Sequence, residues 1–325
     1  MPKGDFIKYV VSNNPNKYPI DGEQGNYYYE KLDIELLESM ESWVENLPVL
    51  SFIGNEDFTL KVYDTTKHWD GTLYYSTDYI SWNIWDGTEI SSGNKLLALR
   101  GTGNTVITGN SSNYRFVFTG SDNLNIKCYG NIETLLDYQT VMNGEHPTMS
   151  TYCYADMFYG CTSLTQAPQL PATTLAEYCY DNMFRNCTSL TTTPELPATT
   201  LANSCYRTMF FNCKSLTKAP QLPATTLAGY CYFNMFYNCK SLTTTPQLPA
   251  TTLAEYCYNG MFSGCINIKL STTQTGEYQL AYRIPTTGTG TTATDALTKM
   301  FTNTGGTFTG TPEINTTYYT SNEIV

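Results

Sequence analysis

The sequence is short of charge, above all of positive charge. Charged residues make up 14% of the 325 residues, and 29 Asp and Glu outnumber 18 Lys and Arg, so the net charge is −11. Such a chain offers no basic patch for a nucleic-acid backbone, and we expect no nucleic-acid partner. The apolar share of 41% is nevertheless too high for a disordered chain.

Long apolar runs are also missing. No stretch approaches the roughly 18 consecutive apolar residues that a membrane-spanning helix needs, so we expect no membrane insertion. The opening residues, from Met1 to Val11, lack the apolar core of a secretory signal. We therefore expect an extracellular protein whose signal has been removed, or one that reaches the outside without a signal, as a virion component does.

Recognisable catalytic motifs are lacking too. The two histidines, His68 and His146, fall in different expected domains, and no serine nucleophile elbow or zinc-protease helix occurs. Residues 288–293 fit the pattern G-x-G-x-x-A, but they lie in a Thr- and Gly-rich segment without a βαβ unit. We expect no enzyme, no catalytic residue and no cofactor.

Acidic residues in the first half could suggest a glycosidase pair or a calcium loop. A glycosidase needs two carboxylates at a set separation, and a calcium loop needs a run of the form D-x-D-x-D-G. That run is absent, so we interpret these acids as ordinary loop residues and expect no metal site. They are Asp57, Asp64, Asp70 and Asp78.

What the sequence does contain is a repeat of 26 residues. Its Met-Phe pair recurs at Met157, Met183, Met209, Met235 and Met261. Within a unit the core residues follow at steps of four, from Leu175 to Cys187, which favours one face of a short helix. We expect a helix within 172–187, capped by Thr173 or Thr174, and then a short strand at 189–191. Such units bury a core only when stacked.

Ten of the eleven cysteines lie at two fixed places in the repeat. The two places within a unit are eight residues apart, too far along a helix for a disulfide, whereas equivalent cysteines of neighbouring units would be close enough. Cysteine is also a common small apolar core residue, and C-x7-C is not a zinc spacing. We expect buried, unpaired cysteine ladders.

The unit resembles the BspA-like leucine-rich repeats of bacterial surface proteins. The likeness rests on the pattern M-F-x-x-C-x-S-L followed by L-P, as in Met157 to Leu164 and then Leu170-Pro171. The last unit departs from it, with Asn267-Ile268 in place of Ser-Leu. The resemblance implies adhesion or binding at a cell surface, in gut and oral bacteria, their parasites or their phages.

The N-terminal residues form a different region. Residues 9–31, with Tyr9-Val10-Val11 and the run from Tyr27 to Lys31, resemble a segment of phage tail and fibre proteins. Residues 33–47 read as an amphipathic helix. That helix could pack on the next domain or form a coiled coil in a homo-oligomer, although it spans fewer heptads than a persuasive coiled coil.

These patterns predict a mixed α and β fold. We expect an N-terminal attachment segment with its helix (1–48), a β-sandwich-like domain (49–145), a leucine-rich-repeat-type solenoid with 26-residue coils (146–270) and a Thr/Gly-rich C-terminal cap (271–325). The sandwich is indicated by alternating segments separated by turn residues, at 58–63, 72–75, 95–99, 114–118 and 125–128.

One variable position of the repeat is a candidate binding surface. Stacked coils would align its residues into a stripe of aromatic rings and one Arg, which are favoured contact residues. These candidate ligand-binding residues are Tyr159, Arg185, Phe211 and Tyr237, with Ser263 in the last unit. The rival surface is an aromatic stretch of the β domain, part of which must be core: Trp69, Tyr74, Tyr75, Tyr79, Trp82 and Trp85.

The function predicted from the sequence is non-catalytic recognition or adhesion. The leading hypothesis is a phage tail or fibre-associated protein that binds a bacterial surface glycan or protein. The alternatives are a BspA-like adhesin on the bacterial cell surface and a glycan-degrading tail enzyme.

Overall fold

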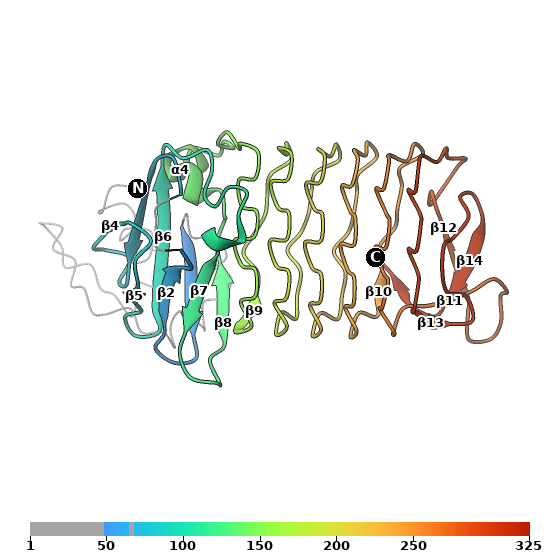
Figure 1. Cartoon of the computed structure of the whole chain (residues 1–325), viewed down its shortest axis with the longest axis horizontal. Coiled ribbons are helices and arrows are strands. Elements are labelled where there is room, and N and C mark those ends of the chain that lie inside the picture. Colours follow the sequence, from blue (N-terminus) through green and yellow to red (C-terminus); the bar gives the residue numbers. More distant parts are fainter. Residues whose placement is uncertain (1–48, 65–67) are drawn as a thin grey trace, which may run out of the picture.

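The computed structural model describes residues 49–64 and 68–325 (Figure 1). The predicted attachment segment and amphipathic helix, residues 1–48, lie outside the described residues. The described chain forms a strand-rich region at one end and a row of stacked coils that leads away from it. Among the described residues, no helix is long and apolar enough to cross a membrane.

Two sheets make up the first region, and their strand pairs are antiparallel except for one parallel pair at the edge of the larger sheet. A six-stranded sheet has the order β4-β3-β6-β1-β8-β9, in which β9 is Leu164–Gln166, and a three-stranded sheet has the order β5-β2-β7. The strands are β1 (Leu50–Gly54), β2 (Thr59–Val62), β3 (Thr72–Ser76), β4 (Asn83–Trp85), β5 (Ile90–Ser91), β6 (Leu96–Thr102), β7 (Phe116–Thr119) and β8 (Ile126–Tyr129). They overlap the five alternating segments of the sequence, because alternation places one face of each strand in the core.

Helical structure in the described residues is confined to a 3-10 turn, η1 (Ser112–Tyr114), and one α-helix, α4 (Thr134–Met142), which is interrupted at Asp137. The core of this region is aromatic: Trp69 and Trp85 stack with ring centroids 5.4 Å apart, and Phe116 meets Trp85 edge-on. Tyr79 is buried as well. These rings of the aromatic stretch are therefore core residues and not a binding surface.

The coils of the repeat are built from consecutive turns, not from a helix. Between residues 152 and 160, two kinds of backbone hydrogen bond alternate. In one, an N–H donates to a carbonyl of the next coil, as Tyr154 does to Cys179 at 2.8 Å. In the other, an N–H donates to the carbonyl three residues earlier in the same coil, as Met157 does to Tyr154. Every fourth residue has a left-handed backbone, for example Tyr178, Asn182 and Asn186, with φ of +56°, +55° and +64°. A left-handed residue in each turn is incompatible with an α-helix.

The fold class predicted from the sequence is therefore wrong. The expected helix at 172–187, its threonine cap and the strand at 189–191 do not form. The sheets are small, and the repeats add only β9 (Leu164–Gln166), β10 (Thr244–Thr245) and β11 (Lys269–Ser271). A mixed α and β chain with a β-sandwich-like domain and a leucine-rich-repeat-type solenoid does not describe this structure.

Equivalent core side chains of successive coils lie in contact with one another. Phe158 stacks on Phe184 with ring centroids 5.5 Å apart, and the series continues through Phe210, Phe236 and Phe262. A second series of buried tyrosines runs from Tyr154 to Tyr258, at 5.6 to 5.8 Å. Identical residues in identical coils therefore fill the core, and one hydrophobic cluster extends from Leu50 to Tyr318.

The prediction of buried, unpaired cysteines is confirmed. All eleven are free and buried. The second cysteine of each coil lies near a carbonyl of the preceding coil: the Sγ of Cys187 is 3.0 Å from the Phe158 oxygen, and Cys213 repeats this contact with Phe184. This position is buried and lies beside a carbonyl oxygen, and cysteine suits it because its side chain is small and apolar and its S–H is a weak donor.

Both ends of the row of coils are covered. At the start, the Phe116 N–H donates to the Met157 carbonyl, and β9 pairs in parallel with β8. At the far end, residues 293–304 add a further coil in which Phe301 stacks on Phe262 at 5.5 Å. The closing strands are β12 (Leu280–Arg283), β13 (Gly305–Gly306), β14 (Thr317–Thr320) and β15 (Glu323–Ile324), of which β15 pairs with β10.

Candidate functional site

The candidate stripe of the sequence forms a continuous column on the coils. The Arg185 guanidinium lies between two rings, 5.8 Å from the centroid of Tyr159 and 4.5 Å from that of Phe211. Phe211 in turn stacks on Tyr237 at 4.6 Å. The column continues into the strand region, where Arg115 lies 5.7 Å from the Tyr159 centroid.

This aromatic–guanidinium column, from Arg115 to Tyr237, has its ring faces occupied by its own members. Tyr159 has a guanidinium on each side, and Phe211 has Arg185 on one face and Tyr237 on the other. A sugar cannot stack on a face that is already covered, so the inner rings present edges and hydroxyls to a ligand. Clamping between rings does hold Arg185 in place, which lowers the entropic cost of using it in binding.

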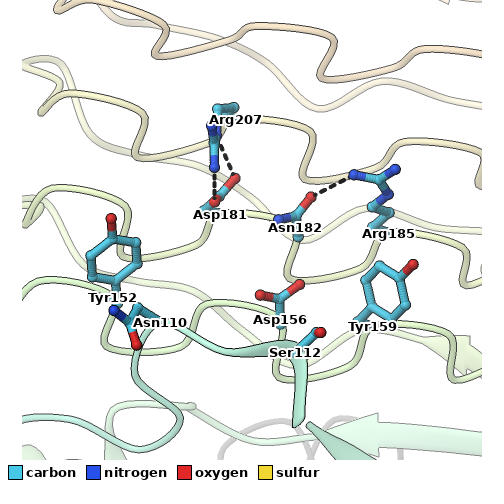
Figure 2. Close-up of a pocket in the computed structure, with 9 residues that line it drawn as sticks. All are labelled: Asn110, Ser112, Tyr152, Asp156, Tyr159, Asp181, Asn182, Arg185 and Arg207. Atoms are coloured by element: carbon cyan, nitrogen blue, oxygen red, sulfur yellow. Dashed lines mark hydrogen bonds and ion pairs between the residues drawn. The ribbon is translucent and has the colours of Figure 1, made fainter. Parts of the chain in front are cut away.

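A pocket of about 470 Å³ opens beside the start of this column (Figure 2). That volume lies within the range of small-molecule sites. Its lining comes from the loop before β7 and from three successive coils. The lining residues are Asn110, Ser112, Tyr152, Asp156, Tyr159, Asp181, Asn182, Arg185 and Arg207.

One wall of the pocket contains a bidentate ion pair between Arg207 and Asp181. Arg207 donates from Nε and Nη2 to the two carboxylate oxygens of Asp181, at 3.0 and 2.6 Å. Burial raises the pKa of Asp181, and the Arg207 hydrogen bonds and charge oppose that rise. Because the Asp181 side chain is only 5% exposed, Arg207 is the group that makes its ionised form tolerable there.

Asp156 lies on the floor of the pocket and differs from Asp181 in having no such partner. It is only 9% exposed, and among the described residues no donor forms a hydrogen bond or ion pair with its carboxylate. Burial, together with the negative charge of Asp181, raises the pKa of Asp156 to about 6, although Arg185, Arg207 and Arg115 oppose the rise. Figure 2 shows this carboxylate among the pocket side chains with no contact drawn to it.

The place of Asp156 in the repeat shows what the backbone prefers there. Its φ is +57°, and the equivalent residues of the following coils also have left-handed backbones: Asn182, Thr208, Asn234 and Gly260. Asn and Gly adopt this conformation at low cost. The only carboxylate of the series therefore stands in the coil that forms the pocket floor.

Other residues singled out in the sequence lie outside the pocket. Asp70 accepts from Thr105 at 2.8 Å and Asp78 from Ser81 at 2.7 Å, and for both acids the hydrogen bonds outweigh partial burial and lower the pKa. His146 contacts Glu133 at 2.7 Å, and His68 stacks on Tyr114. No group of three or more metal-binding side chains occurs in residues 49–64 and 68–325.

Sequence reasoning found two of the pocket residues, Tyr159 and Arg185, and missed the remaining ones. Asp156, Asp181 and Arg207 fall at variable positions of the repeat, which was a signal that could have been used. Asn110 and Ser112 lie outside the repeat, and nothing in the periodicity points to them.

No protein-family model, curated protein or solved structure matches this chain. The resemblances to BspA-like repeats and to phage tail proteins stay predictions from the sequence pattern.

Proposed function

We propose that this chain is a non-catalytic recognition protein that binds a bacterial surface glycan or protein through the pocket and the adjoining column. The observation that carries the proposal is the clamped Arg185, which borders the pocket and is held between Tyr159 and Phe211. A fixed guanidinium beside a polar cavity is the kind of anchor that binding surfaces use. The extracellular setting, on a virion tail or a bacterial surface, belongs to the same proposal and rests on the sequence resemblances alone.

The test is binding of the fluorescently labelled full chain to panels of gut and oral bacteria. Arg185→Gln should lower cell binding at least tenfold, because it removes the charge and the fork of donors and leaves the coil core untouched. The matched control is Lys240→Gln, which removes one positive charge at an exposed position outside the pocket. Equal binding by both variants, or no binding of the unaltered chain to any cell, would overturn the proposal.

A further inference from the structure

Asp156 presents to the pocket a carboxylate that the protein itself leaves without a donor. Asp156 is about nine-tenths buried, lines the pocket and has no hydrogen-bond or ion-pair partner among the described residues. Partial burial disfavours the ionised form of this carboxyl, as its raised pKa shows. A ligand that brings hydrogen-bond donors to both carboxylate oxygens would remove that cost.

The charges around the pocket restrict which donors suit it. The lining holds two acids, Asp156 and Asp181, and two bases, Arg185 and Arg207, so their formal charges cancel. Asp181 and Arg207 are already paired with each other, and Arg185 donates to Asn182 at 3.2 Å. A pocket with no net charge gives neither an anion nor a cation an overall advantage, and neutral hydroxyl donors fit it better.

The remaining lining suits the same chemistry. Asn110, Ser112 and Asn182 supply amide and hydroxyl groups, and Tyr152 and Tyr159 supply phenol hydroxyls at the sides (Figure 2). Two adjacent hydroxyls can donate to the two oxygens of one carboxylate, as the two nitrogens of Arg207 do to Asp181. Neutral sugars carry such pairs.

We infer that this pocket binds a neutral saccharide unit, with adjacent hydroxyls of the sugar donating to the Asp156 carboxylate. The inference rests on the proposed recognition function and names its ligand class. Amino sugars, which carry a cationic ammonium group, are the competing class, and binding of glucosamine alone is an outcome of the test.

The experiment is a titration of the full chain with the methyl glycosides of glucose, galactose and mannose, with glucosamine as the cationic comparison. At least one neutral glycoside should bind at pH 7.5, and Asp156→Asn should weaken that binding at least tenfold. Asn stands at equivalent positions 182 and 234, so the variant is compatible with the local backbone. Asp295→Asn is the matched control, since it makes the same change at a left-handed residue outside this pocket.

The pH dependence gives a second readout. Asp156 must be ionised to accept from two hydroxyls, and its pKa is about 6. Binding should therefore weaken about tenfold between pH 7.5 and pH 5 in the unaltered chain. The Asp156→Asn variant should lose this dependence, because it removes the titrating carboxyl that accepts from the sugar, and because the Arg207 hydrogen bonds and charge oppose the rise in the pKa of Asp181.

Three results would overturn the inference: no binding of any neutral glycoside, binding of glucosamine alone, or equal binding by Asp156→Asn. Cell binding separates this failure from failure of the proposed function. If cells bind the unaltered chain and Arg185→Gln weakens that binding while the glycosides fail, recognition stands and the saccharide pocket does not. If the unaltered chain also binds no cells, the proposed recognition function is refuted as well.

Discussion

Replacing Asp156 by Asn should stabilise the folded protein at neutral pH. In the folded state the carboxyl keeps its proton up to about pH 6, whereas an unfolded chain releases it near the ordinary value of 3.8. The folded state therefore binds more protons between these values. The contribution of Asp156 to stability is most favourable below pH 3.8, is lost as the pH rises through about 6, and stays at its least favourable level above that.

The size of the effect follows from that rise in pKa. A change from 3.8 to about 6 corresponds to about 3 kcal/mol, at 1.36 kcal/mol per pH unit. Water that enters the open pocket reduces the penalty, so we expect a gain of about 1–3 kcal/mol for Asp156→Asn at pH 7. Asn adds no backbone strain at φ +57°, since Asn182 has +55° in the next coil.

The assay is urea unfolding of the full chain and of Asp156→Asn at pH 7 and at pH 4. The difference in free energy of unfolding should favour the variant at pH 7 and nearly vanish at pH 4, where the carboxyl is protonated in the folded protein. Because both proteins share all other titrating groups, the contributions of those groups to the pH dependence of stability cancel in the difference. A variant that is less stable at pH 7, or a difference that does not change with pH, would refute the assignment of Asp156 as a partly buried carboxyl without a partner.

Three further predictions concern the coils. Arg207→Met should destabilise the protein by about 2–4 kcal/mol at pH 7, because it leaves the Asp181 carboxylate buried without its ion-pair partner. Urea unfolding measures this loss of stability, and an unchanged unfolding midpoint would contradict the prediction. Asn212→Ala should cost about 2–3 kcal/mol by removing hydrogen bonds with Asn186 and Asn238 and straining a left-handed residue, whereas Asn212→Gly should cost about 1 kcal/mol less. Iodoacetamide at pH 8 should label no cysteine of the native protein and all eleven in urea, because burial raises the pKa of the thiols and blocks access to them. Mass spectrometry counts the labelled cysteines, and rapid labelling of the native protein would show that the coils open.

The mistaken helix has an identifiable cause. Leu175, Cys179, Met183 and Cys187 follow at steps of four, which is close to the 3.6 residues of a helical turn. In a helix, residues four apart would shift gradually around the helix axis. In these coils, residues four apart occupy the same place in successive four-residue turns, each of which contains one left-handed residue. The Asn, Gly and Asp at positions 156, 160, 182 and 186 carried that information, since these residue types tolerate a left-handed backbone.

The sequence by itself determined the repeat length, the buried cysteines and the identical side chains that fill the core. These follow from identity between units: a residue repeated at a fixed interval meets the same neighbours in each coil, so Phe lies on Phe and Tyr on Tyr. For the same reason Tyr159, Arg185, Phe211 and Tyr237, which share one position of the repeat, lie in one column.

Only the tertiary structure decided the backbone of the coils and the pocket. The coil backbone depends on hydrogen bonds between residues about 25 apart, as from Asp156 to Asp181, and local spacing does not reveal those bonds. The pocket depends on where the loop carrying Asn110 meets the first coils. The Asn110 loop lies outside the repeat, so its contacts with the coils have no period in the sequence pattern.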